Sequence, residues 1–81
     1  MKININETLY IYLKYVMDEL RLNKKKSEII TNASKLLTPD QVMIGVPESL
    51  RKINFNIKLT TQRLRLTIRE PISTTSYILA S

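Results

Sequence analysis

The sequence predicts an α+β fold in which two to three short helices are followed by a two-stranded antiparallel β-hairpin. Two patterns carry this prediction. In the first half, apolar residues recur at steps of three and four, as on one face of an amphipathic helix. After Pro47, apolar and polar residues alternate, as in half-buried strands. With 43% hydrophobic residues, one Gly and three Pro, the composition is that of a globular chain rather than a disordered one.

The first helix is expected from about Asn6 to Leu22, with Asn6 as its N-cap and Asn23 at its end. Its apolar stripe comprises Leu9, Leu13, Val16 and Leu20. Further apolar residues widen the stripe, namely Tyr10, Tyr12, Tyr15 and Met17. These residues either fill the core of the domain or are covered by a second protein. Tyr12 and Tyr15 are therefore candidate contacts with a partner.

A second short helix is expected after the lysine-rich turn at residues 24–26, with Ser27 as its cap. Its apolar face comprises Ile29, Ile30, Ala33, Leu36 and Leu37. The next segment has a clear helix-start pattern, because Thr38 and Gln41 can form a capping box and Pro39 suits the first helical position. A third short helix is therefore expected to begin at Pro39 and to end at Gly45.

The strands of the hairpin constrain each other's register. Apolar residues have odd numbers in the first strand and even numbers in the second, so facing residues must sum to an odd number. Pairing Leu59 with Leu64 and Ile57 with Leu66 satisfies this condition. This register places Thr61–Gln62 at the tip of the hairpin.

The polar face of the hairpin is strongly basic. The expected register sets Lys58 opposite Arg65, and like charges in that position repel one another. An acidic partner lying over this face would relieve the repulsion. Its candidate contact residues are Lys58, Arg63, Arg65 and Arg69.

The residue types argue against catalysis by this chain. It contains no His and no Cys, which removes the usual general base, thiolate nucleophiles, disulfides and structural zinc sites. Its seven Asp and Glu are scattered, without spacing that would pair them across a cleft. We therefore assign no catalytic, cofactor-binding or metal-ligating residue.

The termini contain no segment expected to enter a membrane. No apolar run approaches the roughly 20 residues of a membrane span, and the N-terminus lacks the apolar core of a signal peptide. The expected location is therefore the cytoplasm. Residues 73–81 carry no charged side chain and form either a tail or a partner-binding arm, with candidate contacts Tyr77, Ile78 and Leu79.

Residues 37–50 resemble the gamma subunit of urease. The hallmark of that family is an acidic residue or two, then Val-Met, one residue, Gly-Val-Pro and a nearby apolar position. The residues that match it here are Val42, Met43, Gly45, Val46 and Pro47, with Leu50 as the apolar position. The resemblance continues to Pro71–Ile72, which matches the closing Pro-Ile of the family, and indicates a single domain over residues 1–72. The family has further helices after its first one, and here residues 23–26 bridge that gap.

The resemblance implies a contribution to assembly rather than to catalysis. Ureases hydrolyse urea with nickel ions held in the large subunit, and gamma-type chains pack with beta and alpha subunits into a threefold particle. This chain would then hold no cofactor of its own. The Val-Met-x-Gly-Val-Pro turn would join the last helix to the hairpin, so Met43 and Val46 are expected to be buried.

A nucleic-acid-binding reading is the alternative. The net charge of +6 and a basic hairpin after short helices also fit a small winged-helix-like domain. Residues 38–50 would then be the recognition region, and Arg63, Arg65 and Arg69 the wing. Gly45 and Pro47 would interrupt such a helix after about two turns, leaving little length for a major groove. Nucleic acid is therefore the less favoured partner.

Overall fold

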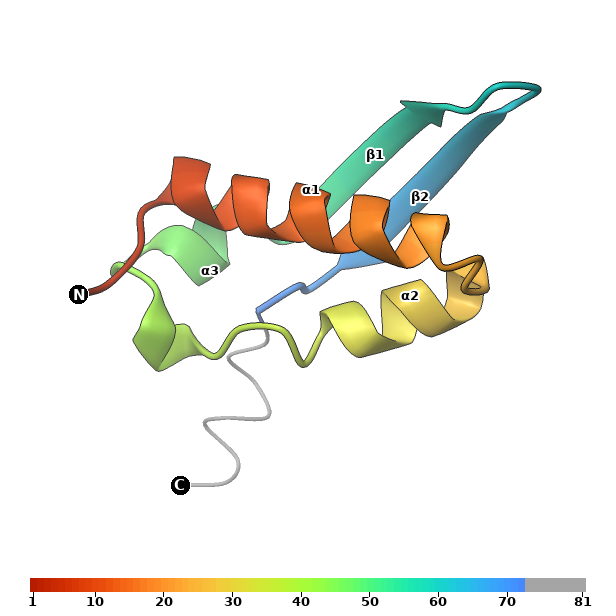
Figure 1. Cartoon of the computed structure of the whole chain (residues 1–81). Helices are drawn as coiled ribbons and strands as arrows, with labels where there is room; N and C mark the ends of the chain where they lie inside the picture. The colour runs from red at the N-terminus through yellow and green to blue at the C-terminus, as the bar shows by residue number, and fades with distance from the viewer. Residues whose placement is uncertain (73–81) are drawn as a thin grey trace.

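The computed structural model describes residues 1–72, in which helices precede a two-stranded antiparallel sheet (Figure 1). The elements follow in the order α1 (Ile5–Arg21), α2 (Lys26–Ala33), a 3₁₀ turn (Pro39–Gln41), α3 (Val46–Ser49), β1 (Lys52–Lys58) and β2 (Arg63–Arg69). The predicted α+β class, with helices first and a hairpin last, is confirmed.

Helix α1 begins two residues earlier than the sequence indicated. Its cap is Asn4, because the Glu7 N–H donates to Asn4 Oδ1 at 2.8 Å and the Asn4 N–H donates to Glu7 Oε1 at 3.0 Å. This reciprocal pair satisfies two backbone donors, which the predicted cap Asn6 would not do. The predicted end is close, since Asn23 adopts a left-handed conformation with φ +59° just after the helix.

The buried face of α1 is rotated from the predicted stripe. Thr8, Tyr12 and Val16 are buried, whereas Leu13 is 42% exposed. Apolar residues surround more than half of this helix, so the sequence alone does not select one face. Packing against the rest of the chain selects the row at four-residue spacing.

The second helix is shorter than expected. Ser27 lies inside its first turn, and the cap position is Lys25, which makes no side-chain capping bond. Leu36 and Leu37 follow the helix and are half-buried, so they are not part of its face. The residues that do bury are Ile29 and Ala33.

The segment after Leu37 begins as predicted and then departs from helix. The Thr38 N–H donates to Gln41 Oε1 at 2.8 Å, and the turn starts at Pro39. It lasts three residues, because Val42 is extended and pairs with Ile3 in a parallel bridge. Gly45, with φ +93°, therefore precedes α3 instead of ending a helix.

The hairpin has the predicted parity but a register shifted by two residues. Ile57 faces Leu64, and Lys58 faces Arg63 rather than Arg65. Residues 59–62 form the loop, which the Leu59 N–H closes by donating to the Gln62 carbonyl at 2.7 Å. Odd-sum parity allows either register, and the observed one places Thr60–Thr61 at the tip, with no positive φ in the loop.

The core lies between the apolar face of the sheet and the helices α1 and α2 (Figure 1). Its central side chains are Tyr12, Val16, Ile29, Ala33, Ile53, Leu66, Ile68 and Ile72. The Tyr12 hydroxyl donates to the Pro71 carbonyl at 2.8 Å and so joins α1 to the segment after β2. This arrangement turns the other face of the sheet away from the core.

Candidate partner-binding surfaces

The described part of the chain holds no group of side chains suited to a metal ion. Among residues 1–72, no three His, Cys, Asp or Glu side chains cluster closely enough for one. Nor does any helix of this region have the length and apolar character needed to cross a membrane. Two surfaces of this region are candidate contacts with other proteins.

The first surface is the polar face of the hairpin, which we call the basic face. Its residues point away from the core because side chains alternate along each strand. The basic face comprises Lys52, Asn54, Asn56, Lys58, Arg63, Arg65, Thr67 and Arg69. Every charged side chain in this set is a cation.

Two cross-strand pairs of the basic face bring like charges together. Lys52 faces Arg69, and Lys58 faces Arg63. The predicted opposition of Lys58 and Arg65 is wrong, and Arg65 faces Asn56 instead. Within residues 1–72, none of these cations makes an ion pair with a carboxylate. Repulsion across each pair is therefore left without a counter-charge in this part of the chain.

A hollow of about 320 Å³ lies in the middle of the hairpin, between the two like-charged pairs. Its polar lining comes from Asn54, Asn56, Arg65 and Thr67. The Thr67 hydroxyl donates to Asn54 Oδ1 at 2.8 Å. That bond engages the acceptor of the Asn54 amide and leaves its N–H₂ group to donate elsewhere.

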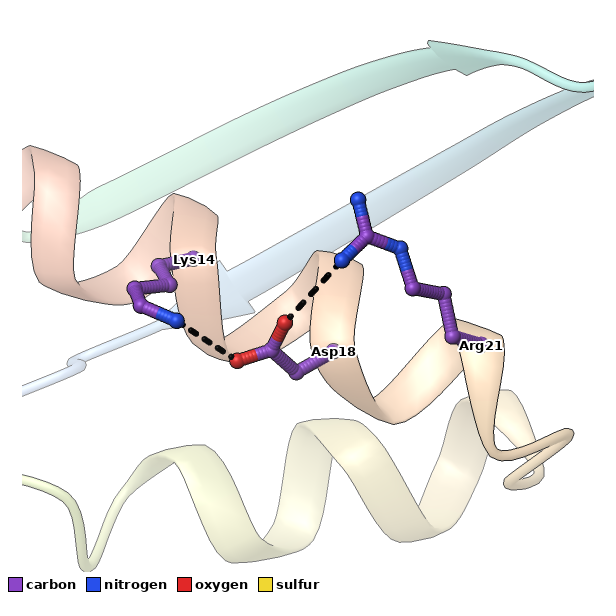
Figure 2. A network of polar contacts seen from close by, with 3 residues as sticks. All are labelled: Lys14, Asp18 and Arg21. Carbon is purple, nitrogen blue, oxygen red and sulfur yellow. Dashed lines mark hydrogen bonds and ion pairs between the residues drawn. The ribbon is translucent and has the colours of Figure 1, made fainter.

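Charges on the helices are arranged differently. Asp18 lies between two cations of α1, 3.1 Å from Lys14 Nζ and 3.5 Å from a guanidinium nitrogen of Arg21 (Figure 2). These residues are three and four positions apart, so they are neighbours on the helix surface. Here the sequence itself supplies the counter-charge.

The second surface is an apolar cluster near the start of α1. Ile44 is fully exposed and Met43 is 49% exposed, beside Ile5 in a hollow of about 320 Å³. The prediction that Met43 is buried is wrong, whereas that for Val46 is confirmed, at 6% exposure. The reason is the extended backbone at Val42, which turns Val42 inward and its neighbour outward.

The predicted tyrosine contacts have different surroundings. Tyr12 is fully buried, and burial raises the pKa of its phenol to about 12. Tyr12 is therefore a core residue, and it is no longer a candidate for a surface contact. Tyr15 is half-buried and donates to the Ile29 carbonyl at 3.2 Å. Burial, followed by the charges of Glu19 and Glu28, raises the pKa of Tyr15. The candidates Tyr77, Ile78 and Leu79 lie outside the described residues.

Several surface residues had not been selected from the sequence. Lys52, Asn54, Asn56 and Thr67 occupy the same face as the predicted cations. The alternating pattern itself would have identified them. Ile44 gave no comparable signal, because its exposure depends on the bridge between residues 3 and 42.

Comparison with known proteins places the whole described region in one family. Residues 1–72 match the family described as "Urease, gamma subunit". The urease subunit gamma of Halalkalibacterium halodurans is 33% identical over 72 residues, which cover 89% of this chain and 72% of that protein. The urease subunit gamma of Yersinia enterocolitica is 29% identical over the same lengths.

Proposed function

This chain belongs to the urease gamma-subunit family, and we propose that it serves as a non-catalytic gamma-type subunit of a urease complex. The observation that carries the proposal is the family match over all of residues 1–72. In this proposal, those residues act as a single domain. The partners are beta- and alpha-type subunits in a threefold cytoplasmic hetero-oligomer, and the large subunit holds the nickel.

The chemistry of the side chains supports a contribution without catalysis. Nickel in proteins favours imidazole and thiolate ligands, and this chain contains neither His nor Cys. Its residues therefore do not fit a nickel site. What the chain offers instead is surface for contacts with other subunits.

Exposed apolar side chains support a partner over the helical side. Ile44 is fully exposed, Tyr10 is 64% exposed and Leu13 is 42% exposed. Covering such residues with another subunit removes apolar surface from water and stabilises the folded chain. A domain of this size without disulfides gains proportionally more from such contacts.

The winged-helix-like alternative is not supported. Residues 38–50 contain a three-residue 3₁₀ turn and a four-residue helix, separated by extended backbone at Val42. Neither segment has the length of a recognition helix. The region proposed to read DNA instead connects the helices to the hairpin.

Affinity purification of the tagged chain from its own cells tests the proposal. We expect a large nickel-containing urease subunit to co-purify in fixed ratio, with urea hydrolysis by the complex. The isolated chain is expected to hydrolyse no urea and to lose nickel during gel filtration. A stable, monodisperse chain that brings no urease subunit with it would refute the proposal.

A further inference from the structure

We propose that the basic face of the hairpin docks a carboxylate-bearing segment of a partner subunit, an inference that rests on the proposed function. The face carries five cations and no anion, namely Lys52, Lys58, Arg63, Arg65 and Arg69. Within residues 1–72, the ion pairs of the chain lie on α1 and reach none of these residues. The basic face therefore has no counter-charge within these residues, and an acidic segment of a partner would supply one.

The two like-charged pairs set the length of the docking surface. Lys52 and Lys58 are six residues apart on β1, about 20 Å at the rise of a β-strand. In each pair, the two cations face each other directly across the sheet, and like charges in that position destabilise the folded chain. A segment with carboxylates near both ends of this stripe would convert both repulsive pairs into attractive contacts.

The hollow between the pairs favours a carboxylate at the centre as well. Arg65 presents a planar guanidinium that can hold a carboxylate through two parallel hydrogen bonds. The Asn54 acceptor is already engaged by Thr67, so its free amide hydrogens add a donor to the same hollow. Asn56, directly across from Arg65, can add another.

The same observations favour a protein over a nucleic acid. The basic face consists of Lys, Arg, Asn and Thr, with no aromatic side chain on which an unpaired base could stack. Phe55 and Leu66 also border the hollow, but the alternation along the strands puts their side chains on the opposite face of the sheet, with Ile53. The short helices near the hairpin provide no element for a major groove.

Charge reversal of Lys58 tests the inference through two opposite effects. In the free chain, Lys58→Glu places a carboxylate opposite Arg63 and should raise the melting temperature. In the complex, the same variant repels the acidic segment and should weaken binding about tenfold or more. Asn56→Asp supplies a carboxylate opposite Arg65, so it should also raise the melting temperature of the free chain and weaken binding to the partner.

The matched control is Lys24→Glu, an equal charge change at an exposed turn residue. Each full-length chain is titrated with purified alpha- and beta-type urease subunits, and separately with a 20-base-pair DNA duplex at two salt concentrations. We expect Lys24→Glu to bind the subunits within about twofold of the wild type.

The possible results separate this inference from the proposed function. If the wild type assembles and Lys58→Glu binds as well as Lys24→Glu, the docking surface is wrong and the subunit assignment stands. If the wild type does not assemble with urease subunits, both the proposed function and the proposed docking partner are wrong. Tighter binding of DNA than of the subunits at physiological salt, lost in Lys58→Glu, would show that the face binds nucleic acid.

Discussion

The helical region and the hairpin region of this chain distribute their charges in different ways. Residues 1–49 contain seven Lys or Arg and six Asp or Glu, a net charge of +1. Residues 50–72 contain six Lys or Arg and one Asp or Glu, a net charge of +5. Most of the total charge of +6 therefore lies on about a third of the chain.

This difference is matched by where ion pairs form within residues 1–72. On α1, opposite charges lie three and four residues apart and meet on the helix surface (Figure 2). On the hairpin, neighbours come from different strands, and the observed register brings cations together. On α1, Asp18 supplies the counter-charge for Lys14 and Arg21, whereas the cations of the basic face make no ion pair within residues 1–72.

The largest expected effect concerns the junction between the two regions. Val46 is buried and Met43 is half exposed, although they are three residues apart. Val46→Asp would bury a charge without a partner and should lower the free energy of unfolding by about 3 kcal/mol or more. Met43→Asp should cost less than about 1 kcal/mol, because its side chain can remain in water. Urea denaturation of both variants tests this, and equal losses would show that the two regions do not share a core at Val46.

A second prediction concerns the hydrogen bond that links the regions directly. Tyr12 on α1 donates to the buried carbonyl of Pro71, which follows β2. Tyr12→Phe removes the donor and should lower the free energy of unfolding by about 1–3 kcal/mol at neutral pH. The control Tyr10→Phe, at an exposed position, should change it little. An equal effect of the two substitutions would mean that the link adds no stability.

The same residue predicts a pH dependence. Burial raises the pKa of Tyr12 to about 12, above the value of about 10 in an unfolded chain. Between these values the unfolded chain binds fewer protons, so the contribution of Tyr12 to stability falls as pH rises from 10 to 12. Thermal melts across that range should show a shallower loss for Tyr12→Phe than for the wild type. Parallel curves would contradict this.

Features of the fold that depend on residues close in sequence were predicted well, whereas features that depend on contacts with distant residues were not. Alternation gave both strands, and their odd-sum parity is confirmed. Residue types favourable to helix starts gave the turn at Pro39. The end of that turn was missed, because Val42 pairs with Ile3 almost forty residues away. The register was missed by two residues, because parity allows both registers and loop geometry decides between them.

The surfaces were predictable to the same extent. The cations of the basic face follow from alternation, whatever the register. Which cations oppose one another depends on the register, so the pairing of Lys58 with Arg63 was not foreseen. The sequence allows Tyr12 to be either a core residue or a partner contact, since an apolar position on a broad stripe does not reveal what covers it. Only tertiary packing assigns it to the core.

A smaller effect is expected at the other like-charged pair of the basic face. Lys52→Glu places a carboxylate opposite Arg69 and should raise the free energy of unfolding of the free chain by about 0.2–1 kcal/mol. High salt should reduce the gain, because the residues are exposed. Lys24→Glu, which has no cross-strand neighbour, is the control. A loss of stability in Lys52→Glu at low salt would show that repulsion across the pair is negligible.

The smallest expected effect lies in the charge network of α1. Asp18→Asn removes both ion pairs, but Lys14 and Arg21 are largely exposed and Asp18 is about half exposed, so each pair should contribute less than about 0.5 kcal/mol. Because Asp18 is close to the C-terminal end of the helix, removing its negative charge also relieves an unfavourable interaction with the helix dipole and offsets part of the loss. Thermal melts at low and high salt should therefore show a slight loss that disappears as salt rises. A loss larger than the gain in Lys52→Glu would reverse the comparison, because the helical network would then affect stability more than the unpaired charges of the hairpin.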